Sequence, residues 1–429
     1  MKIRVLHATA LLAIAAGICL CSQIQNGRAS LIPTANAAPQ AVQKPAVGDP
    51  VSAAAFAWSL FVQAMTPSNG ALTFEGWTEQ TCLIQPGSCP NSATAQTGGK
   101  SRLHHFHRSP LRQKNATSKT KAIQAGVNCG PGAPMNAPGP GTTPVFNGFF
   151  PKNLSSNPCF FEEVFVNPAE STFITKNGLT TLIGQQAYGN QHSNAITFPW
   201  DAVEIKVDWV PASSFTNATF KCPDPTHQLY TENINGTCYA LVGIHISSKA
   251  LPDWLWATFE PNNGITNPNR CNQALYNPCY DPFGTTSTQP YGPGQKPTQS
   301  QPLQQAMKAA QLDPAFNNYF LTGVATQFVD NQKTAIPMGN SFVEFNAQVA
   351  PGQASCITCH RYAYFNGQPP SNGVEQNFGG PLGAPNFPNW PAIGNACYSN
   401  PNGNCLPPSN TSGWTSQDFS WMLGLMGYK

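Results

Sequence analysis

Two cysteines and a histidine near the carboxyl end have types and a spacing that suit one kind of chemistry. They form the segment Cys356-Ile357-Thr358-Cys359-His360, a C-x-x-C-H pattern. Two thiols three residues apart lie on one side of a helical turn, so both can bond to the vinyl groups of one porphyrin. The histidine that follows can then bind the iron from the proximal side. The segment therefore predicts one covalent haem c.

The same residues have a second interpretation, a disulfide or zinc pair that happens to precede a histidine. The chain has 14 Cys and 8 His in 429 residues, and chance alone gives the pattern roughly 0.01 times. No second C-x-x-C is present to complete a zinc site. Haem attachment is the interpretation that we carry forward.

The first residues resemble an export signal. Lys2 and Arg4 precede an apolar run from Leu11 to Leu20, and Ala35-Asn36-Ala37 is an A-x-A cleavage site. We expect residues 1–37 to be a signal peptide and the mature chain to be periplasmic or secreted. No later apolar run is long enough to span a bilayer, so we expect no stable membrane insertion after cleavage.

The mature chain is predicted to be neutral. The formal charge of the whole chain is +3, and residues 1–37 carry three basic residues and no acid, which leaves 3 − 3 = 0. A neutral chain gives no reason to expect a nucleic-acid partner. The 36 Gly and 41 Pro predict many turns and loops, while 25 Phe and 9 Trp can fill a sizeable core.

Ten mature cysteines remain besides the two of the haem motif. An even number in an exported, loop-rich chain predicts five disulfides. Pairing by proximity is an assumption, because sequence does not determine connectivity. It gives the pairs Cys82–Cys89, Cys129–Cys159, Cys222–Cys238, Cys271–Cys279 and Cys397–Cys405.

Hydrophobic periodicity predicts a mixed α+β fold. Residues 38–50 are a Pro/Ala linker, residues 51–300 a mostly β region with long disulfide-pinned loops, and residues 301–429 a helical and loop segment that carries the haem. Strands are predicted at 161–166, 173–175, 202–209, 239–246 and 254–260, the third of them half-buried. Helices are predicted at 56–65, 304–309, 338–349 and 417–426.

Several stretches together resemble a family of exported bacterial single-haem proteins, usually described only as cytochrome c family proteins. The resemblance covers the chain from about residue 55, apart from an insertion at 85–145. It implies covalent haem c and export, and it implies no particular substrate. The stretches that carry it are Ala57–Phe61, Glu204–Lys206 with Trp209, Leu241–His245, Trp254–Glu260, the haem motif and Asp418-Phe419-Ser420.

The second axial ligand of the iron is open at this point. Small electron-transfer cytochromes use a methionine after the motif, and here the only downstream ones are Met422 and Met426. Met338 is an upstream alternative. His245 stands in an apolar strand, where a buried histidine bonded to a backbone carbonyl is the commoner role, and it is also a candidate distal ligand or proton donor.

Other polar residues give weaker signals. Glu260 ends a Trp-rich strand and could serve as an acid or base near a haem, and Glu204 and Lys206 share a strand face as a salt-bridged or exposed pair. His192 and His227 are expected in solvent. The aromatics Trp200, Trp209, Trp254 and Trp256 are expected in the core. His104, His105 and His107 stand in a basic run, which suits a solvated loop, a docking patch for an acidic partner or an adventitious metal site.

Three functions fit these residues. The first is a periplasmic mono-haem electron-transfer protein, which exchanges electrons with a redox partner protein or a small-molecule donor or acceptor. The second is a haem-dependent oxidoreductase of the peroxidase or oxidase kind, with His245 or Glu260 at an open distal site. The third is a module that binds a diatomic gas. The motif supports the first most directly, and whether the chain is an enzyme is open.

Overall fold

A computed structural model of the chain describes residues 44–84, 161–215, 221–234, 236–261, 281–283, 299–328, 336, 338–344, 354–361, 363–365 and 414–424. The predicted signal peptide, the basic run with His104, His105 and His107, and Met426 lie outside these ranges.

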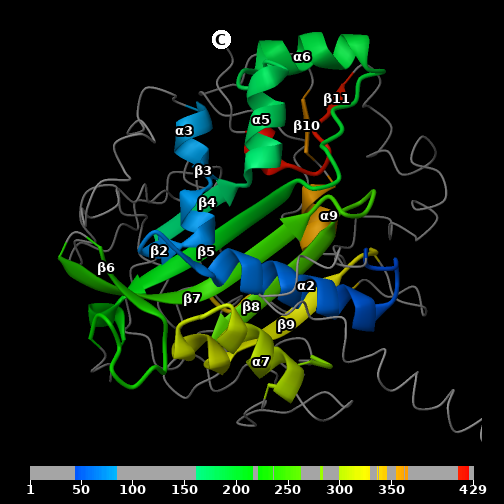
Figure 1. Ribbon diagram of the computed structural model, residues 1–429. Coiled ribbons are helices and arrows are strands. Elements are labelled where there is room, and N and C mark those ends of the chain that lie inside the picture. The colour runs from blue at the N-terminus through cyan, green and yellow to red at the C-terminus, as the bar shows by residue number, and fades with distance from the viewer. Residues whose placement is uncertain are drawn as a thin grey trace, which may run out of the picture.

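One antiparallel sheet of seven strands organises the described chain (Figure 1). Its order is β3 (Thr78–Glu79), β4 (Phe161–Val166), β5 (Val203–Pro211), β7 (Thr237–Ser248), β8 (Leu255–Pro261) and β9 (Tyr319–Ala325), with β6 (Thr231–Ile234) paired to β7. An antiparallel sheet with separate helices is an α+β arrangement, as the sequence predicts. Strands β4, β5, β7 and β8 match predicted strands. Strand β9 is not predicted, and it lies inside the range assigned to the haem segment.

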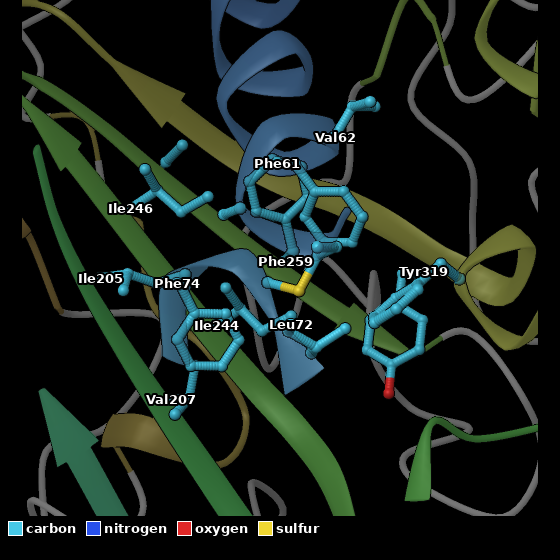
Figure 2. Close-up of a cluster of buried hydrophobic side chains, with 14 of the residues drawn as sticks. Phe61, Val62, Leu72, Phe74, Ile205, Val207, Ile244, Ile246, Phe259 and Tyr319 are labelled. Atoms are coloured by element: carbon cyan, nitrogen blue, oxygen red, sulfur yellow. The ribbon is translucent and has the colours of Figure 1, made fainter. Parts of the chain in front are cut away.

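Helix α2 (Pro50–Met65) covers one face of this sheet. Its start is fixed by Asp49, whose side chain accepts a hydrogen bond from the Val51 amide at 3.1 Å, and by Pro50 in the first turn. Phe61 packs on Phe259 of β8 (Figure 2), and their ring centroids are 4.6 Å apart. Helix α7 (Gln301–Ala309) adds Leu303 and Met307 to the same apolar cluster.

Helix α9 (Cys356–His360) lies on the opposite face (Figure 1). Successive strand residues point to opposite faces, so Ala257 joins the α2 cluster while Trp256 joins a second cluster with Ile357 of α9. This second side also carries α5 (Pro168–Lys176), α6 (Leu182–Gln191), α10 (Trp421–Gly424) and the pair β10 (Tyr364–Phe365) and β11 (Thr415–Ser416). Because both faces are covered, β5 is buried on both, and the half-buried prediction is wrong.

Four further predictions are wrong. The helix predicted at 417–426 begins only at Trp421, because Asp418 and Phe419 form a turn. Residues 173–175 are helical within α5, because Asn167 accepts a hydrogen bond from the Glu170 amide and Pro168 opens the helix. Residues Met338–Phe342 are not helical, because their polar groups bond to the sheet instead. Trp200 is 52% exposed rather than in the core.

The remaining short elements connect these layers. They are β1 (Pro67–Ser68), β2 (Ala71–Leu72), η1 (Thr73–Gly76), α3 (Gln80–Ile84), η4 (Ala212–Ser214) and η5 (Pro314–Asn318). The predicted disulfide Cys222–Cys238 is confirmed. Cys82 is disulfide-bonded, and its expected partner Cys89 and the other predicted pairs lie outside the described residues.

Candidate functional site

The C-x-x-C-H segment forms the short helix α9, as its proposed chemistry requires. Cys356 and His360 are four residues apart and therefore stand one above the other on the helix. Cys356 is a thiol rather than part of a disulfide, and its Sγ lies 3.5 Å from the carbonyl oxygen of Met338. The side chain of Cys359 lies outside the described part. The helix thus presents a thiol and an imidazole together toward the sheet.

One hydrogen bond determines the tautomer of His360. Its Nδ1 lies 2.7 Å from the backbone oxygen of Phe419. A carbonyl oxygen only accepts, so Nδ1 carries the hydrogen and Nε2 keeps a lone pair. Burial, reinforced by the positive charge of Lys206, lowers the pKa of His360 to about 3. Its ring also packs on Trp256, with centroids 4.4 Å apart. His360 is therefore a fixed, neutral imidazole suited to bind a metal through Nε2.

His245 belongs to β7, a central strand of the sheet. Its Nε2 is buried and has no hydrogen-bond partner among the described residues, and Oε1 of Glu344 lies 3.7 Å away. Burial, followed by the positive charge of Lys206, holds the pKa of His245 well below its ordinary value. His245 is therefore neutral, with an uncommitted nitrogen inside the protein.

The structure brings His245 close to the C-x-x-C-H segment. One ligand atom each from His245, Glu344 and Cys356 lie within 4.8 Å of one another. Burial raises the pKa of Glu344 to about 8, so this carboxyl group is largely protonated at neutral pH. The site therefore combines a neutral imidazole and a protonated carboxyl group beside the first cysteine of the motif.

Glu344 reaches this place because its segment, residues 338–344, lies directly on the sheet. An added Cβ on Gly243 would stand 2.9 Å from Val343, and one on Gly323 would stand 2.7 Å from Met338. Only glycine allows such a close approach. Asn340 then donates to the Thr258 hydroxyl and to the Phe259 carbonyl, both at 3.0 Å. The β-bulge at Thr258/Phe259 interrupts the pairing with β9 at this point.

The predicted polar residues of the strands have structural partners. Glu260 is 1% exposed and accepts a hydrogen bond from the Ser341 amide at 2.9 Å, so it anchors the same segment. Glu204 and Lys206 do not pair with each other. Lys206 forms an ion pair with Glu162 at 2.8 Å, and Glu204 accepts a hydrogen bond from the Ser420 hydroxyl.

The other candidate ligands fall into two groups. Met422 and Met338 are each 2% exposed and belong to the apolar cluster that contains Ile357. His192 is exposed and stacks on Tyr188, and His227 is exposed beside Asp313. The two methionines belong to the same apolar cluster as Ile357 of α9, and neither exposed histidine is part of it.

Sequence reasoning missed Glu344 and Asn340, and it gave Phe419 no role of its own. A signal for Glu344 existed, because it is a lone acid within the apolar run Phe342-Val343-Glu344-Phe345. Asn340 acts through side-chain hydrogen bonds to a distant strand, and Phe419 acts through its backbone carbonyl, so neither role can be recognised from residue type.

No helix in the described part of the chain combines the length and the hydropathy needed to cross a bilayer. Comparison with protein-family models, with curated proteins and with solved structures finds no match. The function of the site therefore has to be argued from its own residues.

Proposed function

We propose that the chain is an exported mono-haem c-type cytochrome that transfers electrons. Cys356 and Cys359 would carry the porphyrin as thioethers, and His360 would bind the iron. The observation that carries this proposal is the hydrogen bond from His360 Nδ1 to the Phe419 carbonyl, which leaves Nε2 as a neutral ligand. Bound haem would supply one-electron redox chemistry.

The residues present fit such a group in two ways. Cys356 is kept as a thiol in a chain whose described part also contains a disulfide, and thioether formation needs a thiol. Trp256 and Phe419 hold the imidazole from two sides, one through ring contact and one through a hydrogen bond. Export would agree with this chemistry, because disulfides persist in oxidising compartments.

We propose that His245 would supply the second protein ligand of the iron, with Met422 as the alternative. His245 lies near Cys356, is neutral, and has a buried nitrogen without a hydrogen-bond partner in the described chain. Met422 is supported only by its place in the apolar cluster beside Ile357, and packing is the common role of a buried methionine. A filled second axial position favours electron transfer over ligand binding. The electron donor or acceptor would be a redox partner protein or a small molecule.

The first test asks whether the haem is covalent. The full chain is expressed with a c-type maturation system, and its absorption is compared with that of the double variant Cys356→Ser/Cys359→Ser. We expect a haem spectrum that survives denaturation in the natural chain and is lost in the variant. The matched control is Cys222→Ser/Cys238→Ser, which replaces two cysteines of a disulfide elsewhere and should keep its colour. A colourless natural chain would refute the proposal.

The second test assigns the ligand. His245→Gln should produce a high-spin ferric spectrum and ready binding of CO, whereas Met422→Leu should leave a low-spin spectrum. A charge-transfer band typical of methionine–iron coordination, lost in Met422→Leu, would transfer the assignment to Met422.

One observation favours a second function, a haem-dependent oxidoreductase. His245 and Glu344 place a neutral base and a protonated acid 3.7 Å apart, and the pKa of Glu344 is raised to about 8. Such a pair can move protons near neutral pH. Ready CO binding by the natural chain, together with peroxide turnover lost in His245→Gln, would support this function over the carrier. CO binding without turnover would support a gas-binding module.

A further inference from the structure

The turn that holds His360 has an unusual backbone. Asp418 and Phe419 have φ values of 52° and 68°, in the left-handed region that disfavours side chains other than glycine. Two adjacent residues there cost free energy, and they persist only when surrounding contacts enforce them. This turn points the Phe419 carbonyl at His360 Nδ1.

The first anchor of the turn is the side chain of Asp418, which accepts from one charged and one neutral donor. One oxygen of its carboxylate receives a hydrogen bond from Lys249 Nζ at 2.5 Å, and the other receives one from the Phe198 amide at 2.8 Å. Lys249 is 3% exposed and directly follows β7. Its Nζ also donates to the Pro252 carbonyl at 2.6 Å. The ion pair therefore ties the turn to a fixed end of the sheet.

A second anchor lies on the other side of Phe419. The Ser420 hydroxyl donates to Glu204, a residue of β5. Glu204 and Ser420 are both buried. The carbonyl that bonds His360 is thus held between two links to two neighbouring strands.

We infer that Lys249, Asp418, Ser420 and Glu204 are positioning residues for His360, which fix its tautomer and strengthen it as an iron ligand through the Phe419 carbonyl. The expected effect of these residues on haem rests on the proposed function. Their effect on the tautomer of His360 does not require haem. A hydrogen bond to the far nitrogen of a ligating histidine raises its basicity. A more basic ligand favours the ferric state, so loosening the turn should raise the reduction potential.

Lys249→Met separates this role from a simple charge effect. Loss of a positive charge alone favours the ferric state and lowers the potential, whereas a loosened turn raises it. Ser420→Ala changes no charge and should raise the potential by a smaller amount. Asp281→Asn is the control, because Asp281 is a buried carboxylate that accepts from Trp58 of α2, on the opposite face. We expect it to lower the unfolding temperature without changing the potential.

A haem-free measurement keeps the test independent of the proposed function. In the Cys356→Ser/Cys359→Ser background, nitrogen NMR of His360 should show the Nδ1–H tautomer alone. Adding Lys249→Met or Ser420→Ala should give mixed tautomers and faster exchange of the imidazole proton. If the natural chain never holds haem yet these changes occur, the proposed function fails and the positioning role stands.

The inference is overturned if both variants leave the His360 tautomer unchanged. It is also overturned if the reduction potential falls in the Lys249→Met variant and is unchanged in the Ser420→Ala variant. Ser420→Ala removes a single hydroxyl, so it remains informative even where Lys249→Met does not fold.

Discussion

His360 illustrates how one backbone atom can define a side chain's chemistry. Without the Phe419 carbonyl at 2.7 Å, either nitrogen of the ring could carry the hydrogen. With it, only Nε2 keeps its lone pair for a metal. The residue type was visible in the sequence, whereas the tautomer follows from a residue 59 positions away.

Gly243 is the residue at which a single methyl group should disturb the site. An added Cβ would lie 2.9 Å from Val343 and 3.0 Å from Asn340. We expect Gly243→Ala to push the 338–344 segment off the sheet and to cost about 1–3 kcal/mol in the free energy of unfolding. Chemical denaturation measures this change.

Gly76→Ala is the matched control for this substitution, because nothing lies within 4 Å of the Cβ that it would add. Its free energy of unfolding should change far less. Equal effects at the two glycines would show that close approach at β7 is not the cause.

At the level of elements, the sheet owes its two-sided burial to what covers it. The sequence of β5 alternates apolar and charged residues, which usually indicates one wet face. Its charged residues instead meet partners from other elements, Lys206 with Glu162 and Glu204 with Ser420. Periodicity reports residue polarity, and the covering elements decide whether a polar face meets water.

Strand β3 carries a carboxyl group whose titration should make the free energy of unfolding depend on pH. Burial raises the pKa of Glu79 from 4.5 to about 7, against opposing hydrogen bonds from Thr81. The folded chain then holds this proton more tightly than the unfolded chain. The protonated carboxyl group therefore adds to the free energy of unfolding fully below pH 4.5. This stabilisation, about 3 kcal/mol at most, is lost as the pH rises to about 7.

Glu79→Gln should remove this dependence. The variant and the natural chain should have similar stability at pH 4, and the variant should be the more stable one at pH 8. Urea denaturation of the haem-free chain at both pH values measures this difference. A variant that is less stable at pH 8 would mean that the ionised carboxylate is the favoured form in the folded chain.

At the scale of the whole molecule, the two apolar clusters share one set of strands. Neighbouring residues such as Trp256 and Ala257 belong to opposite clusters. The layer with α2 and the layer with α9 therefore depend on the same sheet. Damage to either cluster should weaken the other through β7 and β8.

The disulfide Cys222–Cys238 should stabilise this unit by restricting the unfolded chain. It joins residues 16 positions apart, and replacing both by Ser should lower the free energy of unfolding by about 2–4 kcal/mol. Chemical denaturation of oxidised protein gives the value. An unchanged denaturation midpoint in the double variant would contradict the expectation.

The sequence by itself determined the C-x-x-C-H pattern, four of the long strands, helices α2 and α7, and the pair Cys222–Cys238. These are local patterns, in which spacing or periodicity within a short segment carries the information. The same reading failed at residues 173–175, where a capping asparagine outweighed a short apolar run, and at Met338–Phe342, where bonds to the sheet replaced helical ones.

Only the tertiary structure decided which residues surround the motif. His245, Glu344 and Cys356 come from three separate parts of the chain, and they meet because Gly243 and Gly323 let a segment lie on the sheet. The strained turn at Asp418 and Phe419 likewise exists only because Lys249 and Glu204 hold it. Contacts between distant segments depend on packing and backbone direction, and neither is written in the order of residues along the chain.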